Sequence, residues 1–369
     1  MVTKKMRSTT RTDKEYVERE IARWRGPDDA LQLLYNHRLI VWPSFPVGLR
    51  ILILNWNSLT RLPDLPDTLE QLDCGNNFLT ELPAKLPPSL RILKCEENRL
   101  TSLPTEMPDS LEEIHCGANL LTVLPAKMPS GLRTFYCDRN RITALPSALP
   151  DGLEILGCSG NCLTALPSAL PDRIRWLSCS HNQITILPDR LPAGLVDLSC
   201  SHNQITMLPD RLPAGLVDLT CNNNPLIGLP ETLPSGIQML FASDCCLTRL
   251  PSRLPESLIY LGCDRNRLTE LPETLPAGLL RLSCGFNRLK TLPFRLPPGL
   301  RNLWCECNNF VCQQNYLEGL PFIGRLRAVE EKARTIHRCA VLKEAIVAAA
   351  WTPARVERWL EAGVDLECL

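Results

Sequence analysis

Hydrophobic residues recur along most of this chain with a period of 21 residues. Each unit follows the pattern L-P-x-x-L-P-x-x-L-x-x-L-x-C-x-x-N-x-L-T-x, which residues 82–102 illustrate well. Such a fixed period predicts a solenoid, in which each repeat packs only on its neighbours. The clearest marker is a ladder of cysteines, with Ala242 replacing one of them: Cys74, Cys95, Cys116, Cys137, Cys158, Cys179, Cys200, Cys221, Cys263, Cys284 and Cys305.

The short segment L-x-x-L-x-C predicts a β-strand, because its alternate positions are apolar and turn-forming residues bound it. Stacked copies are expected to pair in parallel, about 4.8 Å apart. An asparagine three residues after each cysteine is expected to turn the chain and to satisfy backbone groups in the bend. The limb L-P-x-x-L-P should be extended, since proline lacks an amide hydrogen and disfavours helix in the preceding residue.

The repeats are predicted to form an array of about 13 units of 20–21 residues, within residues 46–312. The first unit is diverged and has Leu54 in place of the cysteine and Asn57 in place of the asparagine. The units that begin at Cys179 and Cys200 are almost copies of each other. This duplication favours a binding surface of adjustable length over an active site of fixed geometry.

The segments on either side of the array predict helices. Residues 1–12 are predicted to be a disordered basic tail, with a targeting or phosphate-binding signal as the alternative. Residues 13–45 are predicted to form an N-terminal helical cap, with one helix starting at Asp13 and a second, after Gly26-Pro27, carrying Leu31 and Leu33. Residues 313–369 contain a helical apolar stripe from 324 to 350 and a second helix from Pro353. This segment is either a cap or a docking module.

Composition excludes several classes of partner. The 369 residues carry 40 basic and 40 acidic side chains, so no net field attracts nucleic acid or an anionic membrane. No apolar run reaches the roughly 20 residues that cross a bilayer, and the N-terminus lacks the core of a secretory signal. The ladder cysteines occupy an apolar position, which favours buried free thiols over disulfides or metal ligands. We therefore expect a reducing, intracellular compartment, the cytoplasm.

No catalytic, cofactor or metal site is predicted. Ser180, His181, Asp197 and His202 have the residue types of a nucleophilic site, but the two histidines are copies in duplicated units. Duplication does not produce a nucleophile beside one base that a third group orients. The repeat with Ala242 also has Cys245 in the asparagine position, which is either tolerated drift or a reactive thiol.

Metal ligands are too sparsely paired to predict a site. Cys305, Cys307 and Cys312 form the densest group, and Cys245-Cys246 the next, but neither has the two C-x-x-C pairs of a zinc site. The sequence has no phosphate-binding glycine motif of the common types. Cofactors are therefore not expected.

The repeat pattern resembles that of leucine-rich repeat proteins. Its short unit and its LP-x-x-LP limb resemble the YopM-like and IpaH-like effectors of bacterial type III secretion, over roughly residues 46 to 312. The resemblance implies an α/β solenoid: a horseshoe with a parallel β-sheet on its concave face, an extended convex limb and small helical caps at both ends. IpaH-like proteins carry a ubiquitin-ligase domain, for which the 57 residues after Cys312 are too few.

The resemblance and the variable strand positions together predict a non-enzymatic scaffold for protein–protein interaction. The resemblance further suggests a pathogen effector that acts inside a host cell. The alternative is an adaptor that selects a substrate with its repeats and recruits a modifying enzyme, such as ubiquitin-ligase machinery, with its C-terminal helices. Aromatic and arginine side chains are enriched at binding hot spots. The residues predicted to bind the partner on the concave face are Tyr136, Trp176, Asp197, Asp218, Phe241, Tyr260, Arg265, Arg281, Phe286 and Trp304.

Overall fold

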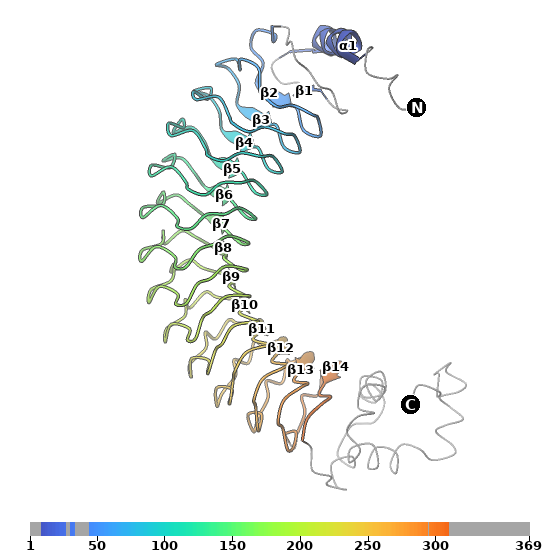
Figure 1. Ribbon diagram of the computed structural model, residues 1–369. Helices are drawn as coiled ribbons and strands as arrows, with labels where there is room; N and C mark the ends of the chain where they lie inside the picture. Colours follow the sequence, from blue (N-terminus) through green and yellow to red (C-terminus); the bar gives the residue numbers. More distant parts are fainter. Residues whose placement is uncertain (1–8, 27–29, 34–43, 294, 310–369) are drawn as a thin grey trace, which may run out of the picture. The chain divides into compact units, whose positions relative to one another are not determined.

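The computed structural model describes residues 9–26, 30–33, 44–293 and 295–309 (Figure 1). The basic tail at residues 1–8 and the predicted C-terminal helices lie outside these ranges. Within them, the chain is a parallel β-solenoid whose repeats each contribute one three-residue strand. The elements are α1 (Thr9–Arg23), β1 (Ala30–Gln32), β2 (Ile51–Ile53), β3 (Gln71–Asp73), β4 (Ile92–Lys94), β5 (Glu113–His115), β6 (Thr134–Tyr136), β7 (Ile155–Gly157), β8 (Trp176–Ser178), β9 (Asp197–Ser199), β10 (Asp218–Thr220), β11 (Met239–Phe241), β12 (Tyr260–Gly262), β13 (Arg281–Ser283) and β14 (Asn302–Trp304).

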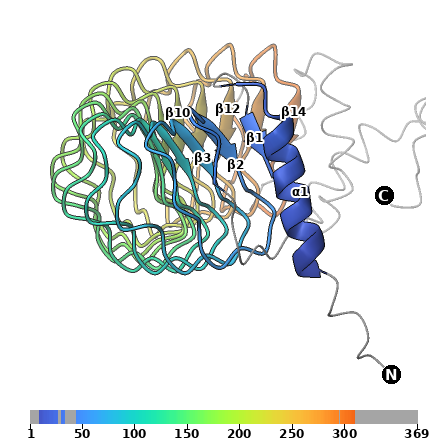
Figure 2. The ribbon, with the colours of Figure 1, turned by 90° about the horizontal axis from the view of Figure 1, so that it is seen from above.

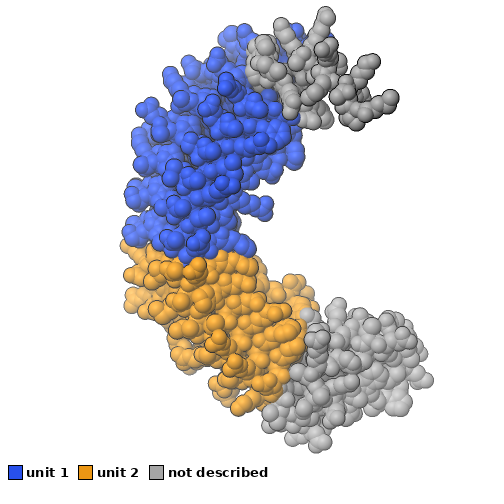
Figure 3. Space-filling model, in the orientation of Figure 1, with its two compact units in different colours: residues 1–184, 191–195 blue, residues 185–190, 196–369 orange. Residues whose placement is uncertain are grey.

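The chain divides into two compact units (Figure 3). The first unit contains residues 1–184 and 191–195, and its strands β1–β8 pair in parallel in the order of the sequence. The second unit contains residues 185–190 and 196–369, and its strands β9–β14 pair in the same way. The predicted array of about 13 repeats, from Leu54 to Cys305, is confirmed by strands β2–β14.

Every strand buries its middle residue and points its first and third residues to the other side, where they are at least partly exposed except for the buried third residues of β7, β12 and β13. In register, these middle residues stack on one another, as Leu72 does on Leu93 and Leu240 on Leu261. Each of these four leucines is 0% exposed. The outward first and third residues of the strands make up what is here called the strand face. Figure 2 shows the strands along one wall of the coils and the return limbs along the other.

The ladder cysteines are buried free thiols, as predicted. Those from Cys74 to Cys284 are 0% exposed, and Ala242 fills the vacant place in the ladder with no exposure either. Several thiols donate to the next repeat, for example Cys158 Sγ to the Ser178 carbonyl at 3.3 Å. All cysteines of the described residues are free, so the ladder acts as a stack of small apolar side chains.

The asparagine ladder joins consecutive repeats. The Asn98 side-chain amide donates to the carbonyls of Cys95, Glu96 and, in the preceding repeat, Cys74, at 3.0–3.2 Å. Its oxygen accepts the amide hydrogen of Leu79 at 2.9 Å. Since the same four bonds recur along the array, one buried side chain per repeat satisfies the backbone of two adjacent turns.

The repeat around Ala242 shows how this bond pattern is partly replaced. Cys245, in the asparagine position, directs its Sγ at the carbonyls of Cys221 and Ser243 at 3.5 and 3.4 Å. Burial raises the pKa of the Cys245 thiol to about 11, which keeps it in the weakly nucleophilic neutral form. The structure therefore favours tolerated drift over a reactive thiol.

The N-terminal segment differs from its prediction in two ways. Helix α1 begins at Thr9 rather than Asp13, so residues 9–12 are helical and do not belong to a tail. The residues before Asp13 include no glycine or proline, so no helix-breaking residue prevents the helix from starting N-terminal to Asp13. The predicted second helix is wrong at residues 30–32, because this segment forms strand β1, paired with β2.

Strand β1 belongs to a further, incomplete repeat. Leu31 and Leu33 are buried on either side of the exposed Gln32, which is the alternation of a strand. Leu33 takes the cysteine place, and the Asn57 side chain donates to its carbonyl at 2.6 Å. Helix α1 also buries Val17 completely, while its role as a cap stays a prediction.

We expect the asparagine ladder to control stability. Asn182→Ala removes three donated bonds and one accepted bond. The buried Leu163 amide loses its acceptor, and the Cys158 carbonyl keeps its bond from Asn161 but loses the one from Asn182. The expected loss is about 3 kcal/mol, since each unsatisfied buried group costs roughly 1–3 kcal/mol. Urea unfolding should show this loss for Asn182→Ala but not for Gln183→Ala, its exposed neighbour. Equal losses in the two variants would contradict the role given to the ladder.

Stability should also fall in alkaline solution. Burial raises the pKa of the Cys179 thiol from 9.0 to about 12, and raises those of Cys95 and Cys116 well above the ordinary value. The unfolded thiols ionise near pH 9 while the folded ones stay neutral. Their contribution is therefore complete below about pH 9 and is lost as pH rises towards the folded pKa, by about 1.4 kcal/mol per pH unit per thiol.

The test is the slope of the free energy of unfolding against pH, from pH 9 to 11. Cys179→Ala should reduce that slope by the share of one thiol. Leu177→Ala removes buried volume from the same repeat without removing a titrating group. It should lower stability at every pH and leave the slope as it is; a slope that follows stability instead would refute the linkage.

Candidate functional site

Aromatic side chains gather at two places on the strand face, one in each unit. In the first unit, the His115 and Tyr136 rings lie with centroids 4.9 Å apart, and the Tyr136 and Trp176 rings 5.8 Å apart. These three residues, from β5, β6 and β8, are here called cluster 1. The sequence predicted Tyr136 and Trp176 as partner-binding residues, and the structure brings them together. His115 was not among the predicted residues.

Cluster 1 lies in a partly desolvated setting. Burial, then the charges of Asp138 and Glu113, raise the pKa of Tyr136. Burial and then Lys94 lower the pKa of His115, so its ring is neutral at pH 7. Cluster 1 therefore presents three uncharged rings above a border of charged side chains.

In the second unit, the predicted residues Phe241, Tyr260 and Trp304 form cluster 2. Phe241 meets Tyr260 edge to face at 4.6 Å between centroids, and Tyr260 stacks on Trp304 at 6.4 Å with a 20° interplanar angle. The Arg281 guanidinium lies 5.9 Å from the centre of the Tyr260 ring. Such an arrangement combines apolar area with a cation–π contact, which is common at binding hot spots.

A glycine makes room for the rings of each cluster. A Cβ on Gly157 would lie 2.6 Å from Tyr136 Cδ1 and 2.6 Å from Asp138 Oδ2. A Cβ on Gly262 would lie 3.0 Å from Phe241 Cδ1. Both glycines hold the third strand position, immediately after an aromatic residue in register. Sequence reasoning missed them, although a glycine in an outward strand position signals the close approach of another group.

The predicted pair Arg265 and Phe286 lies beside the strand face, in the turn that follows each strand. The Arg265 guanidinium lies 4.5 Å from the centre of the Phe286 ring. Both residues have a left-handed backbone, with φ of 52°. Asparagine, aspartate and glycine adopt this conformation most readily, and a bulky residue there is unusual. Phe286 is nevertheless 41% exposed, as is Trp56 at 67% in the same turn position, with φ of 57°.

The remaining predicted pair, Asp197 and Asp218, is aligned in register at the first position of β9 and β10. Burial raises the pKa of Asp218, whose Oδ1 accepts a hydrogen bond from the Thr220 hydroxyl at 3.4 Å. The two carboxyl groups make the β9–β10 side of the second unit acidic, whereas Arg281 on β13 contributes a positive charge.

The histidines of the rejected nucleophilic site have a conformational role. His181 and His202 take the left-handed turn position, with φ of 54° and 53°, which Asn76 and Asn223 occupy elsewhere. Histidine is enriched in this conformation. Among the described residues, no three potential metal ligands gather at one place, and Cys312 lies outside them.

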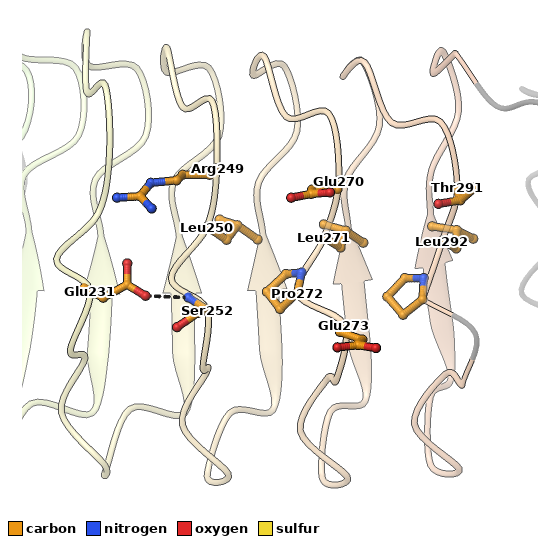
Figure 4. A pocket seen from close by; sticks show the side chains of 11 residues that line it. Glu231, Arg249, Leu250, Ser252, Glu270, Leu271, Pro272, Glu273, Thr291 and Leu292 are labelled. Carbon is orange, nitrogen blue, oxygen red and sulfur yellow. Dashed lines mark hydrogen bonds between the residues drawn. The ribbon is translucent and has the colours of Figure 1, made fainter.

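A groove of about 760 Å³ runs along the return limbs of the second unit (Figure 4). Glu231, Arg249, Glu270 and Glu273 line it together with leucines and prolines of successive repeats. The Glu231 carboxylate accepts the Ser252 amide hydrogen at 2.9 Å. Hydrogen bonding from the Ser252 side chain and then from this amide lowers the pKa of Glu231. The groove contains none of the predicted binding residues.

The repeat geometry matches that of solved leucine-rich repeat proteins. YopM from Yersinia enterocolitica is 36% identical over 74% of this chain, with a TM-score of 0.65, and this chain covers 63% of its length. The leucine-rich effector protein YopM from Yersinia pestis is 32% identical over 80% of this chain and 86% of that one, also with a TM-score of 0.65. This chain belongs to the YopM family of leucine-rich repeat proteins.

The cysteine ladder of this YopM-family chain has a counterpart in another solved structure. The functional domain of InlJ from Listeria monocytogenes includes a cysteine ladder. It is 26% identical over 71% of this chain and 63% of that one, with a TM-score of 0.60. No family model and no curated protein matches the chain. In the described residues, no helix is suited in length and apolar character to crossing a membrane.

The glycine under cluster 1 gives a test of how its rings are held. Gly157→Ala should displace the Tyr136 ring, because the new methyl group would lie far inside van der Waals contact with it. The near-ultraviolet circular dichroism of the aromatic side chains should then change. Gly152→Ala is the matched control, since its Cβ would lie 3.6 Å from its nearest neighbour, the Leu132 carbonyl oxygen. An unchanged spectrum for Gly157→Ala would show that glycine does not position the ring.

Proposed function

We propose that this YopM-family protein is a protein-interaction scaffold, and that it binds a protein partner through the strand face. The observation that carries the proposal is the pair of ring clusters on outward strand positions. Most of the rings that form them could have been small polar residues without loss to the core, as Ser199 and Thr220 are in other repeats. The rings are partly exposed, and contiguous apolar area on a surface marks interaction sites.

The surface is also held in place before any partner arrives. Rings touch rings, glycines keep the space that the rings occupy, and short strands fix the backbone beneath them. A preformed surface loses little side-chain entropy when it binds. The left-handed turns of Trp56 and Phe286 support the same proposal, since a bulky residue there costs stability and gains exposure.

We also place its action in a reducing compartment, inside a host cell. Free thiols persist in the reducing cytosol, whereas secreted proteins of oxidising compartments form disulfides. The partly exposed Cys162 and Cys246 are free as well as the buried ladder. The relative from Yersinia pestis is an effector protein, and the proposal extends that role to this chain.

The test compares two triple variants of the full chain. Phe241→Ala/Tyr260→Ala/Phe286→Ala removes rings from the strand face and the adjacent turn. Ile186→Ala/Met207→Ala/Ile227→Ala removes three apolar side chains, 58–62% exposed, from the return limbs of the same unit. Capture from host-cell lysate, quantified by mass spectrometry, should lose a partner protein at least tenfold with the first variant and keep it with the second. Equal capture by both, with unchanged circular dichroism, would reject the strand face as the binding site.

A further inference from the structure

The residues that immediately precede the strands form a continuous column, here called the flanking column. In the first unit, backbone bonds of 2.7–2.9 Å link each member to the next, from Glu70 N–H and the Arg50 carbonyl to Arg175 N–H and the Glu154 carbonyl. Its members alternate strictly between basic and acidic: Arg50, Glu70, Arg91, Glu112, Arg133, Glu154 and Arg175.

The charges of this first-unit column pair with one another. The Arg50 guanidinium donates to both oxygens of Glu70 at 2.7 and 2.8 Å. Arg91 donates to Glu112 at 2.8 and 2.9 Å, and Arg133 donates to Glu154 at 3.1 Å. Six of its seven charges are thus paired within the unit, and the column presents a polar edge.

In the second unit, the same column becomes largely apolar. The same backbone bonds, at 2.8–2.9 Å, join Val196, Val217, Gln238, Ile259, Leu280 and Arg301. Ile259 is 38% exposed, and Met239, next to Gln238, is 39% exposed. Val196, Val217, Met239, Ile259 and Leu280 are here called the apolar stripe.

The apolar stripe contributes little to the solenoid itself. The buried leucines of the strands and limbs form the core without it, and the first unit shows that charged residues serve equally well in this column. Ile259 and Met239 are exposed, and Val196, Val217 and Leu280 are partly exposed. Apolar side chains with such exposure, beside a column that is polar and self-paired in the first unit, indicate a surface that another molecule covers.

Opposite charges lie at the two ends of the apolar stripe. Asp197 and Asp218 follow Val196 and Val217 directly, at the start of β9 and β10. Arg281 follows Leu280, and Arg301 is the next member of the flanking column. A partner that covers the stripe therefore meets carboxylates at one end and guanidinium groups at the other.

We propose that the apolar stripe is the docking site of an amphipathic α-helix of a protein partner. The inference rests on the proposed function and names the kind of segment that the scaffold takes. Four strand spacings of about 4.8 Å make the stripe about 19 Å long, which is the length of about 13 helical residues. A helical turn of about 5.4 Å is close to the strand spacing, so apolar residues of successive turns meet successive repeats.

The charges fix the direction of the bound helix. Its N-terminus, the positive end of the helix dipole, lies over Asp218, with lysine or arginine in its first turn. Its C-terminus lies towards Arg281, with aspartate or glutamate in its last turn. An extended segment would not match the stripe, since side chains on one face of a strand recur at about 6.6 Å.

The test uses a displayed library of 15-residue peptides with leucine fixed at positions 1, 5, 8 and 12 and all other positions random. Selection on the full chain should enrich basic residues in the first turn and acidic residues in the last. A synthetic peptide of the enriched sequence should lose at least tenfold in affinity for Val217→Glu/Ile259→Glu. It should lose less than twofold for Arg91→Ala/Arg133→Ala, the matched change in the first unit.

Several outcomes would overturn the docking site. Enriched peptides without the charge order, or with full affinity for Val217→Glu/Ile259→Glu, would reject it. A photo-crosslinker at position 259 that joins the stripe to residues 310–369 would assign it to the chain's own segment. A dimer in sedimentation that Val217→Glu/Ile259→Glu dissociates would assign it to a second copy.

The same variants separate this inference from the proposed function. Loss of the lysate partner in the ring variant, together with full peptide affinity in the stripe variant, would reject the docking site and leave the scaffold function standing. A stripe that binds its helix while both triple variants capture the same lysate proteins would reject the strand face alone.

Discussion

One buried amide per repeat is the interaction on which the rest of this protein depends. The strands have only three residues each, too few to hold a repeat by ladder bonds alone, and the limbs are rich in proline. The asparagine supplies the missing link, since its amide and oxygen bind two successive turns at once. Because buried asparagines satisfy the hydrogen bonds of the backbone turns, the outward strand positions are not needed for stability and can vary with function.

The outward positions have been used differently in the two units. The first unit pairs its flanking charges and gathers the rings of His115 and Trp176 around Tyr136. The second unit combines a ring cluster of its own with an arginine, an apolar edge and two carboxylates. A single repeat pattern thus supports two chemically distinct surfaces, and the second one is where we propose that a partner helix docks.

The repeat itself could be predicted from the sequence because its markers are buried and therefore restricted. Cys95 fills the core and Asn98 bonds the turn, and both residue types recur every 21 residues, so the period is visible in the sequence. Strand β1 was missed because Leu31 and Leu33, which follow Gly26-Pro27, were assigned to a second helix. Leu33 nevertheless lies 21 residues before Leu54, so the period alone would have found it.

The site could be predicted only in part. The repeat register predicts that Tyr260 and Phe241 lie on the same surface. Which rings touch depends on their rotamers, and these are set by side chains of the adjacent repeats. Gly157 and Gly262 were overlooked because a missing side chain has no pattern of its own. The change in the flanking column was visible in the sequence, but its meaning depends on the ion pairs of Arg91 and Arg133, which only coordinates reveal.

The left-handed turn residue has a consequence for how such a protein changes over generations. Tryptophan, glutamate, alanine, arginine, histidine and phenylalanine all occur there with φ near 55°. The bend is held by the asparagine that follows this residue, whose side-chain amide donates to the two preceding carbonyls, as Asn98 does to Cys95 and Glu96. Mutation can therefore change the side chain in the left-handed position without reshaping the backbone. Copying or losing one repeat then moves a chosen side chain along its unit by about 4.8 Å. Selection can therefore change the distance between two contact residues in steps of one repeat, and no loop has to be remodelled.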